Sequence, residues 1–242
     1  MNKTMFFLLA FVLLLSSISF GSVVKVEVSE TLKGDIVTSG IKSSGNLFNF
    51  TLEFYNTGTI AYVASIRGDI YQNNTKIFTA WSNDETLMPG SRKNFKLLWY
   101  ALDKGDYVLK PRIYFANEIY EADDIEITVN SSGKEVSYFG VKNVRTFYNK
   151  ILLTLSNSNS SIGKIFVIPY DYPAGWIFEQ AELAPSAEQS VYLDYRPTVF
   201  SEKPLTILVA SEEGYYMKTL YLRRESGIES FILNLLFSVF NF

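Results

Sequence analysis

The sequence predicts an all-β protein built as two tandem β-sandwich domains. Three observations predict it: apolar and polar residues alternate along most of the chain after Val23, turn-forming residues separate these runs, and the two halves repeat the same order of signals. A period of two places every second side chain on the same face of a strand. Many short alternating strands joined by polar turns are typical of sandwiches and barrels.

The alternation is clear from Phe48 to Phe54, where Asn49, Thr51 and Glu53 interrupt the apolar residues. This pattern predicts a strand with one buried and one solvated face, and it places Asn49 on the solvated face. Comparable runs follow at Phe95, Leu97 and Trp99, at Ile125, Ile127 and Val129, at Ile151, Leu153 and Leu155, at Val191, Leu193 and Tyr195, and at Leu205, Ile207 and Val209. Turn-forming residues lie between them at Asn56-Thr57-Gly58, Pro89-Gly90, Lys104-Gly105-Asp106 and Glu213-Gly214.

The small polar stretch Asn130-Ser131-Ser132-Gly133-Lys134 predicts a linker between two domains of ordinary size. We therefore expect five segments in the chain. They are a signal peptide or signal anchor at residues 1–22, a first sandwich at 23–129, a linker at 130–135, a second sandwich at 136–225 and an apolar C-terminal helix at 226–242.

The two halves share the spacing of their turns and strands. Pro89 precedes Phe95, Leu97 and Trp99 by six, eight and ten residues, and Pro185 precedes Val191, Leu193 and Tyr195 by the same intervals. A strand that ends in an asparagine turn lies upstream of each proline, at Asn56 and at Asn157. The order predicts a duplicated module. The alternative is two unrelated sandwiches that use the same turn chemistry.

These turn signals resemble those of known surface modules. Asn56-Thr57-Gly58, Pro89-Gly90 before Trp99, and Gly105-Asp106-Tyr107 resemble the immunoglobulin-like CARDB-type and S-layer-associated modules of prokaryotic, archaeal-type surface proteins. Pro173-Ala174-Gly175-Trp176 followed by Leu183-Ala184-Pro185 resembles the NEW3-type module, although Ser186 replaces the usual glycine. The resemblance implies two tandem immunoglobulin-like sandwiches that bind, space or scaffold, without catalysis.

The N-terminus has the three parts of a secretory signal: a positive start at Lys3, an apolar run from Met5 to Leu15, and small residues up to Gly21 and Ser22. We expect cleavage near Gly21 or Ser22. The apolar run is shorter than the roughly 20 residues of a spanning helix, and the alternative is an uncleaved signal anchor. In either case we expect the rest of the chain outside the cytoplasm, at the cell surface or the outer face of the membrane.

The C-terminal segment changes to a helical period. Its apolar residues recur three and four positions apart, at Ile228, Phe231, Ile232, Leu235, Leu236, Val239 and Phe240. Fifteen residues make roughly 22 Å of helix, which is too short to span a bilayer core. We expect this helix to act as a tether that lies in a membrane interface or binds an envelope protein. The third alternative is that it packs on its own domain.

Composition excludes several functions. The chain has no histidine and no cysteine, which removes thiolate nucleophiles, Ser-His-Asp triads and the usual zinc ligands, so we expect neither an enzyme nor a cofactor. Without Lys3, 21 basic residues face 25 acidic ones, a net charge near −4. A weakly acidic chain without a basic cluster is a poor nucleic-acid ligand.

Two sets of residues are candidate sites for sugars. Four sequons make possible glycosylation sites at Asn49, Asn73, Asn130 and Asn159. Aromatic residues that could stack on a bound sugar gather in the second half, at Tyr170, Tyr172, Trp176, Tyr215, Tyr216 and Tyr221. The alternative for these rings is a core or a surface ladder, because Tyr and Trp are ordinary strand residues.

The acidic run Glu121, Asp123, Asp124 and Glu126 could hold Ca²⁺, but it has no calcium-loop spacing, and a solvated strand edge is the better interpretation. Three hypotheses remain. The first is a tethered, non-catalytic structural or interaction module of the cell envelope, the second a carbohydrate-binding or adhesive module, and the third a carboxylate-based hydrolase, for which the sequence places no acid pair. The sequence sets no oligomeric state.

Overall fold

The computed structural model describes residues 30–146, 150–160, 163–170, 178–194 and 204–221. The chain divides into two compact units, Met1–Glu30 and Thr31–Phe242. Only Glu30 of the first unit is described, so the account below concerns the second. Its described residues form antiparallel sheets in a sandwich-like arrangement and no helix, which confirms the all-β prediction. The predicted signal segment 1–22 and the C-terminal helix 226–242 lie outside the described residues.

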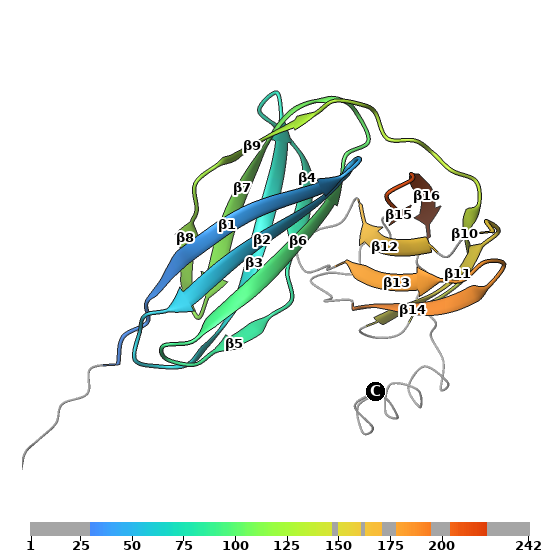
Figure 1. The fold of residues 1–242 in the computed structure, drawn as a ribbon. Helices are drawn as coiled ribbons and strands as arrows, with labels where there is room; N and C mark the ends of the chain where they lie inside the picture. Colours follow the sequence, from blue (N-terminus) through green and yellow to red (C-terminus); the bar gives the residue numbers. More distant parts are fainter. Residues whose placement is uncertain (1–29, 147–149, 161–162, 171–177, 195–203, 222–242) are drawn as a thin grey trace, which may run out of the picture. The chain divides into compact units, whose positions relative to one another are not determined.

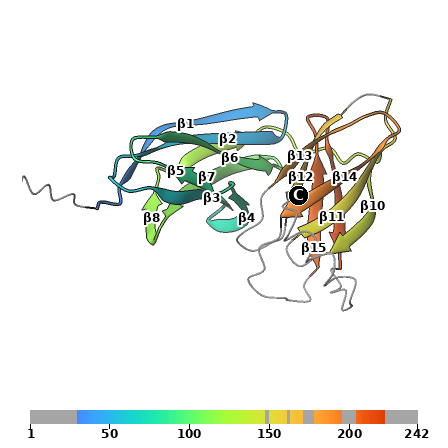
Figure 2. The same ribbon diagram turned by 90° about the horizontal axis from the view of Figure 1, so that it is seen from below.

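Nine strands form the first pair of sheets (Figure 1). They are β1 (Gly34–Ser44), β2 (Leu47–Asn56), β3 (Tyr62–Gln72), β4 (Thr75–Trp81), β5 (Glu85–Leu87), β6 (Arg92–Tyr100), β7 (Gly105–Phe115), β8 (Glu118–Glu121) and β9 (Ile125–Val129). One sheet has the order β1-β2-β6. The other has the order β4-β3-β7-β8, with β5 paired to β3 and β9 paired to β7. Figure 2 shows these two sheets as separate layers.

Seven strands form the second pair of sheets. They are β10 (Phe139–Thr146), β11 (Lys150–Asn157), β12 (Gly163–Pro169), β13 (Glu179–Leu183), β14 (Glu188–Asp194), β15 (Leu205–Ala210) and β16 (Tyr215–Leu220). Their sheets have the orders β10-β11-β14 and β13-β12-β15-β16. The division into separate domains at residues 130–135 stays a prediction.

Alternation decides which side chains form the core. In β2, Phe50, Leu52 and Phe54 are buried, and in β6 the same holds for Phe95, Leu97 and Trp99. Burying each such side chain contributes roughly 1.5–3 kcal/mol, so these two paired strands carry much of the stability of the first half. β15 is buried at every position, which places apolar neighbours on both of its faces.

In both halves a buried asparagine at the end of one strand hydrogen-bonds to the end of another, just before a proline turn. We call this arrangement the corner. Asn56 Nδ2 donates to the carbonyl oxygens of Ile60 and Leu87, and Asn56 Oδ1 accepts from the backbone N–H of Gly58. Asn157 likewise donates to the carbonyl oxygen of Leu183 and accepts from the next-but-one backbone N–H. Leu87 and Leu183 each lie two residues before a proline. Each amide therefore fastens the end of a strand to a proline turn.

Backbone conformation at the turns agrees with this correspondence. Gly90 and Ser186 each follow the proline, and their φ angles of 74° and 53° are both left-handed. The position requires a conformation that glycine adopts most easily. Ser186, the departure from the NEW3-type pattern, therefore keeps the turn geometry despite its side chain.

Strand pairing is also the same in the two halves. Leu52 pairs with Phe95 in the first, and Leu153 pairs with Val191 in the second. In the edge strands, Gly34 of β1 pairs with Asn56, and Phe139 of β10 pairs with Asn157. In both strands the register shifts at the third residue after that pair. Strands β10 to β15 therefore correspond to β1, β2, β3, β5, β6 and β7, while β16 pairs along β15 as β8 and β9 together pair along β7. This geometry favours the duplicated module over two unrelated sandwiches.

The stretch predicted as a linker makes ordered hydrogen bonds. Asn46 Nδ2 donates to the carbonyl oxygen of Ser131 at 2.8 Å, and the N–H of Gly133 donates to the carbonyl oxygen of Leu102 at 2.7 Å. A Cβ on Gly133 would lie 2.7 Å from the Tyr100 ring, so this position requires glycine. These hydrogen bonds at Ser131 and Gly133 restrain the segment more than its composition suggests.

The corner asparagines generate the first testable prediction. We expect Asn56→Ala to lower the free energy of unfolding by about 2–4 kcal/mol, because it leaves buried carbonyl and N–H groups without partners. Asn157→Ala should cost a similar amount, since its bonds are equivalent. Asn94→Ala, at an exposed position of β6, is the control and should change stability by less than about 0.5 kcal/mol. Chemical denaturation measures all three, and equal effects of the control and Asn56→Ala would contradict the corner's role.

Candidate ligand-binding face

The outer face of the β4-β3-β7-β8 sheet carries charged and aromatic side chains in ordered rows. They occupy the positions that alternate with the core residues of each strand. Strand register sets one row across the sheet, formed by Trp81, Arg67, Arg112 and Glu121. A second row places Asp69 between Thr79 and Lys110. We call this surface, defined by these seven residues together with Tyr71, Lys76 and Tyr114, the β3–β7 face.

Asp69 is the centre of the face. Its side chain is 3% exposed, and Arg67 on the same strand holds it with two contacts of 3.0 Å, from Nε to Oδ1 and from Nη2 to Oδ2. Thr79 donates its hydroxyl to Oδ1 at 2.6 Å. Lys76 and Arg112 lie 3.8 and 3.9 Å from the carboxylate. One buried carboxylate therefore orients three cations around it.

Cross-strand geometry explains why this carboxylate is needed. Arg67 and Arg112 lie directly opposite each other on paired strands, and like charges in that position repel. Asp69 contacts both guanidinium groups, and Glu121 contacts Arg112 Nε at 3.1 Å. Burial by itself would lower the pKa of Arg112, but the carboxylates of Glu121 and Asp69 raise the pKa above its ordinary value. Arg112 thus stays charged, and contacts with the carboxylates fix both arginines in position.

Aromatic rings lie beside these cations. The Arg67 guanidinium lies over the Trp81 ring at 5.8 Å, and Trp81 and Tyr114 have ring centroids 5.5 Å apart. The Lys110 ammonium lies over the Tyr71 ring at 5.6 Å. Such cation–π contacts restrain long side chains that would otherwise be free to rotate. The result is a surface whose apolar and charged groups alternate at fixed positions.

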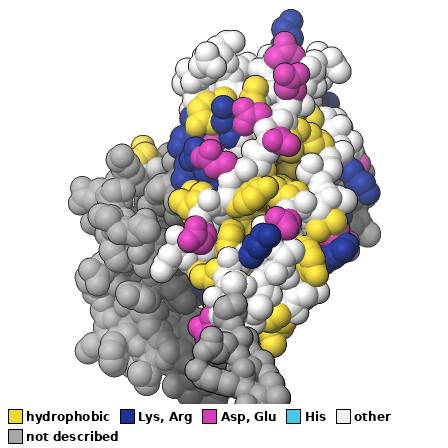
Figure 3. Space-filling view, turned by 90° about the vertical axis from the view of Figure 1, so that its left-hand side faces the viewer, with side chains coloured by type: hydrophobic (Ala, Val, Ile, Leu, Met, Phe, Trp, Pro, Cys, Tyr) yellow, Lys and Arg dark blue, Asp and Glu magenta, His cyan; other side chains and the backbone are white. Residues whose placement is uncertain are grey.

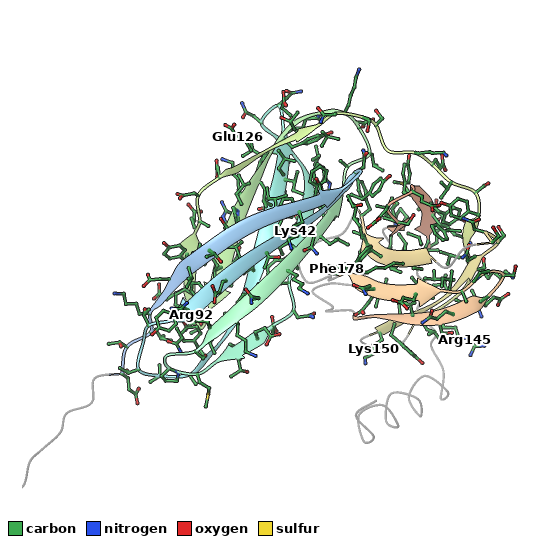
Figure 4. All side chains as sticks on the ribbon, in the orientation of Figure 1. Lys42, Arg92, Glu126, Arg145, Lys150 and Phe178 are labelled. Carbon is green, nitrogen blue, oxygen red and sulfur yellow. The ribbon has the colours of Figure 1, made fainter. Side chains whose placement is uncertain are left out.

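A hollow of about 720 Å³ opens along one side of the face. It is lined by Tyr71, Asn73, Asn74, Asp106, Tyr107, Val108, Lys110, Arg112, Asp124, Glu126, Ile127 and Thr128. Lys110 Nζ lies 3.0 Å from Asp124, and Figure 4 shows Glu126 on β9. Burial, then the charge of Asp103, raise the pKa of Tyr107, so its hydroxyl stays protonated and donates to the Asp103 carbonyl oxygen.

The hollow offers hydrogen-bond donors, acceptors and an aromatic ring, which together suit a polar, uncharged ligand. Charges of both signs lie side by side, and Figure 3 shows the same mixture, with hydrophobic side chains between them, on one side of the molecule. Across the described ranges, no group of three or more acidic residues is placed to hold a metal ion. None of the described residues forms a helix long and apolar enough to cross a membrane.

The predicted glycosylation sites fall in four different environments. Asn73 is exposed and forms the tip of the β3–β4 hairpin, where the left-handed φ angles of Asn73 and Asn74 make a type I′ turn. Asn130 is exposed after β9, and Asn159 is half-buried beside the second corner. Asn49 is in β2 as predicted and is half-buried, with its Oδ1 atom buried, so the face expected to be solvated is partly covered there. Leu98, its partner in β6, is buried as well.

The candidate sugar-stacking residues do not form one platform among the described residues. Tyr170 packs against Phe78, with ring centroids 5.3 Å apart, and Tyr215 packs against Tyr100 at 5.4 Å. Tyr216 follows Tyr215 in β16, so it points to the opposite face and packs on the second core. Tyr172 and Trp176 lie outside the described residues, as do the proposed tether residues from Ile228 to Phe240.

Sequence reasoning missed the β3–β7 face. Its residues occupy the polar positions of β3, β4 and β7, and alternation alone identifies those positions as solvent-facing without showing which of them are neighbours. For the acidic residues Glu121 and Asp124, the sequence alone predicts only a solvated strand edge. Their interpretation changes because the register brings them to Arg112 and Lys110.

Comparisons with known proteins show no family. No protein-family model matches the chain, and no curated protein sequence matches it. Among solved structures, the transglutaminase of red sea bream is 14% identical, with a TM-score of 0.31 over 82% of this chain and 32% of its own. The exo-chitosanase CsxA of Amycolatopsis orientalis is 11% identical, with a TM-score of 0.26 over 76% of this chain and 26% of its own.

The chaperone YadV is 11% identical, with a TM-score of 0.26 over 76% of this chain and 99% of its own. The present chain thus spans about a third of the transglutaminase and about a quarter of the chitosanase. Structural similarity at these TM-scores supports no conclusion about function.

The Asp69 network generates the second prediction. We expect Asp69→Ala to lower the free energy of unfolding by about 2–4 kcal/mol, because it removes the carboxylate that holds Arg67 and leaves Glu121 as the counter-charge of Arg112. Asp124→Ala removes a carboxylate from an exposed pair and should cost less than about 1 kcal/mol. Thermal and urea unfolding at low and high salt measure the difference. An Asp69→Ala variant as stable as Asp124→Ala would show that Asp69 does not organise the face.

Proposed function

We propose that the protein is a non-catalytic interaction module of the cell envelope, exposed outside the cytoplasm, that contacts its ligand through the β3–β7 face. The observation that carries the proposal is the buried carboxylate of Asp69, which holds Arg67, Lys76 and Arg112 beside half-buried aromatic rings. Side chains that are already ordered lose little conformational entropy on binding. Such a surface is suited to binding a ligand.

The same geometry argues against a catalytic role for its acids. Glycoside hydrolysis needs two carboxylates that face each other across a cleft, one of them protonated. Here Asp69, Glu121 and Asp124 each contact a cation, and Asp69 is covered by its partners. These acids therefore serve to position cations.

The finer architecture of the proposal is two tandem immunoglobulin-like sandwiches. It is supported by the matching strand orders of the two halves and by the equivalent corners at Asn56 and Asn157. Modules of the CARDB and NEW3 types, which the sequence resembles, bind or space other parts of surface proteins. A duplicated sandwich would in this case carry the β3–β7 face away from an anchoring point.

The anchoring point in this proposal is the apolar segment at residues 226–242, which is included on the basis of its sequence alone. The segment would lie in the membrane interface or bind an envelope protein, since burying its many large apolar side chains elsewhere is strongly favourable. The N-terminal segment 1–22 would direct export. Together the two ends give an extracytoplasmic location, which the folded strands by themselves do not decide.

Removing the C-terminal segment tests the tether. We expect a chain truncated after Arg224 to move from the membrane fraction to the soluble extracytoplasmic fraction, while its circular dichroism and unfolding midpoint stay unchanged. A matched control replaces Leu235 and Leu236 by serine and leaves the length intact; it should show partial release. A truncated protein that stays bound to the membrane after signal cleavage, or that unfolds, would contradict the tether.

Carbohydrate binding is the second candidate function, and the hollow of about 720 Å³ beside Tyr71 favours it. A sugar presents apolar C–H faces and a ring of hydroxyl groups, so its site needs an aromatic surface with donors and acceptors around it. Tyr71 supplies the ring, Lys110 and Arg112 supply donors, and Glu126 and Thr128 supply acceptors. In this candidate function the sugar site lies in the first half, instead of at Tyr170, Tyr215 and Tyr216.

A panel of immobilised neutral and acidic oligosaccharides tests this candidate. We expect binding of at least one neutral oligosaccharide, and a decrease of about tenfold or more in affinity for Tyr71→Ala, from lost stacking and a lost hydrogen bond. Lys96→Ala removes an exposed cation from β6, outside the hollow, and should bind as well as the unchanged protein. No binding at all, or equal losses in both variants, would eliminate the sugar-binding candidate.

A further inference from the structure

Strand β1 offers a long free edge. The sheet order β1-β2-β6 places Gly34–Ser44 at the border of its sheet, and within the described part of the chain its other side pairs with no strand (Figure 1). Most of its residues are exposed. The free backbone N–H and C=O groups of an edge strand can accept a further strand. Proteins usually protect such edges with charges, prolines or bulges. β1 has no proline and no inward-turned charge, but it contains a bulge and Lys42, so a strand that pairs with it must fit both.

A bulge decides which way its side chains face. The register with β2 shifts between Ile36 and Thr38, so Val37 is an extra residue. As a consequence Ile36 and Ile41, which are five residues apart, both face the core and pair with Phe54 and Phe50. By the same count, Asp35 and Lys42 both face outward.

We propose that β1 pairs with β1 of a second copy of this chain, antiparallel, about a two-fold axis at Ser39. The register follows from the bulge. Counting Val37 and Thr38 as one position, Asp35 lies opposite Lys42 of the second copy, Ile36 lies opposite its Ile41, and Ser39 lies opposite its own equivalent. Each pair shares a face of the sheet, as antiparallel neighbours must.

Charge complementarity selects this partner. Asp35 and Lys42 are exposed, and neither forms an ion pair with another described residue (Figure 4 shows Lys42 on β1). With the two-fold axis, Asp35 of each copy pairs with Lys42 of the other, so two salt bridges form and all four charges have partners. Parallel pairing in register would instead place Asp35 against Asp35 and Lys42 against Lys42.

Space at the edge agrees with the register. The bulged pair Val37 and Thr38 would lie opposite Gly40 of the second copy. A Cβ on Gly40 would meet nothing within 4 Å, so this position has room for the extra residue of the neighbouring strand. The self-pairing joins two three-stranded sheets into one continuous sheet of six strands, with the order β6-β2-β1-β1-β2-β6.

A single cysteine tests the two-fold axis in the full-length protein. The chain contains no cysteine, so Ser39→Cys introduces a unique thiol. Directly opposite residues have Cα atoms about 4.5–5.5 Å apart in an antiparallel pair, within the range of a disulfide. We expect mild oxidation to give a covalent dimer. Ser43→Cys is the matched control, because it faces the same way but would lie about 26 Å from its equivalent, and it should give at least about tenfold less dimer.

A charge exchange tests the register independently of any thiol. Asp35→Lys places lysine against Lys42 of the other copy, and Lys42→Asp places aspartate against Asp35. Each variant alone should therefore dimerise about tenfold or more weakly than the unchanged protein in sedimentation experiments. In a mixture of the two variants, both pairs of the mixed dimer become opposite in charge. We expect the mixture to recover dimer formation, and high salt to weaken it.

Other occupants of the edge predict different results. If a different protein or another segment of this chain covers β1, Ser39→Cys and Ser43→Cys will give equally little dimer, and mixing the charge variants will restore nothing. Either result overturns the proposal. Circular dichroism of each variant separates these outcomes from misfolding, and a variant that folds, fails alone and dimerises in the mixture supports the proposed register.

Discussion

The corner asparagines are the constraint on which both halves depend. Asn56 ends β2 in one sheet, and its amide binds the carbonyl of Leu87, which ends β5 in the facing sheet. Asn157 connects β11 to β13 in the same way. The chain must cross between sheets at the proline turn, where backbone groups leave the strand ladder and would otherwise be buried without partners. One amide supplies those partners and fixes the distance between the layers, so the apolar faces meet in register.

The β3–β7 face depends on that scaffold, because its charges are held by strand positions that the core decides. Ile66, Ile70, Leu109 and Ile113 are fully buried, which turns Arg67, Asp69 and Arg112 outward. Two arginines opposite each other on a bare surface would repel. The burial of Asp69 between them converts repulsion into a fixed arrangement, and the charged groups of Arg67 and Lys110 lie over the Trp81 and Tyr71 rings. The side chains that we propose contact a ligand therefore also contribute to stability.

The sequence was sufficient for the fold class and for the asparagine and proline turns of both halves, because alternation and proline spacing are local signals. It predicted β2, β6, β9, β11, β14 and β15 from their alternating residues, and it placed both corners. It gave no sign of β1, because the bulge at Val37 breaks the alternation between Ile36 and Ile41. It placed Asn49 on a solvated face, since periodicity separates the two faces of a strand but does not show what covers either one. The contact between Arg112 and Asp69 depends on register between strands forty residues apart, which no single-strand pattern contains.

The correspondence between the two halves shows which described strand is found only in the first half. A shared set of strands, corners and bulges recurs in both halves, so these parts serve folding in each copy. Strand β4 has no counterpart among the described strands of the second half, and it carries Lys76, Thr79 and Trp81, three of the groups that surround Asp69 and Arg67. The added hairpin widens one sheet by a strand and thereby completes the charged and aromatic rows. Among the described residues, β4 is therefore specific to the first half, where its side chains complete the surface that we propose contacts a ligand.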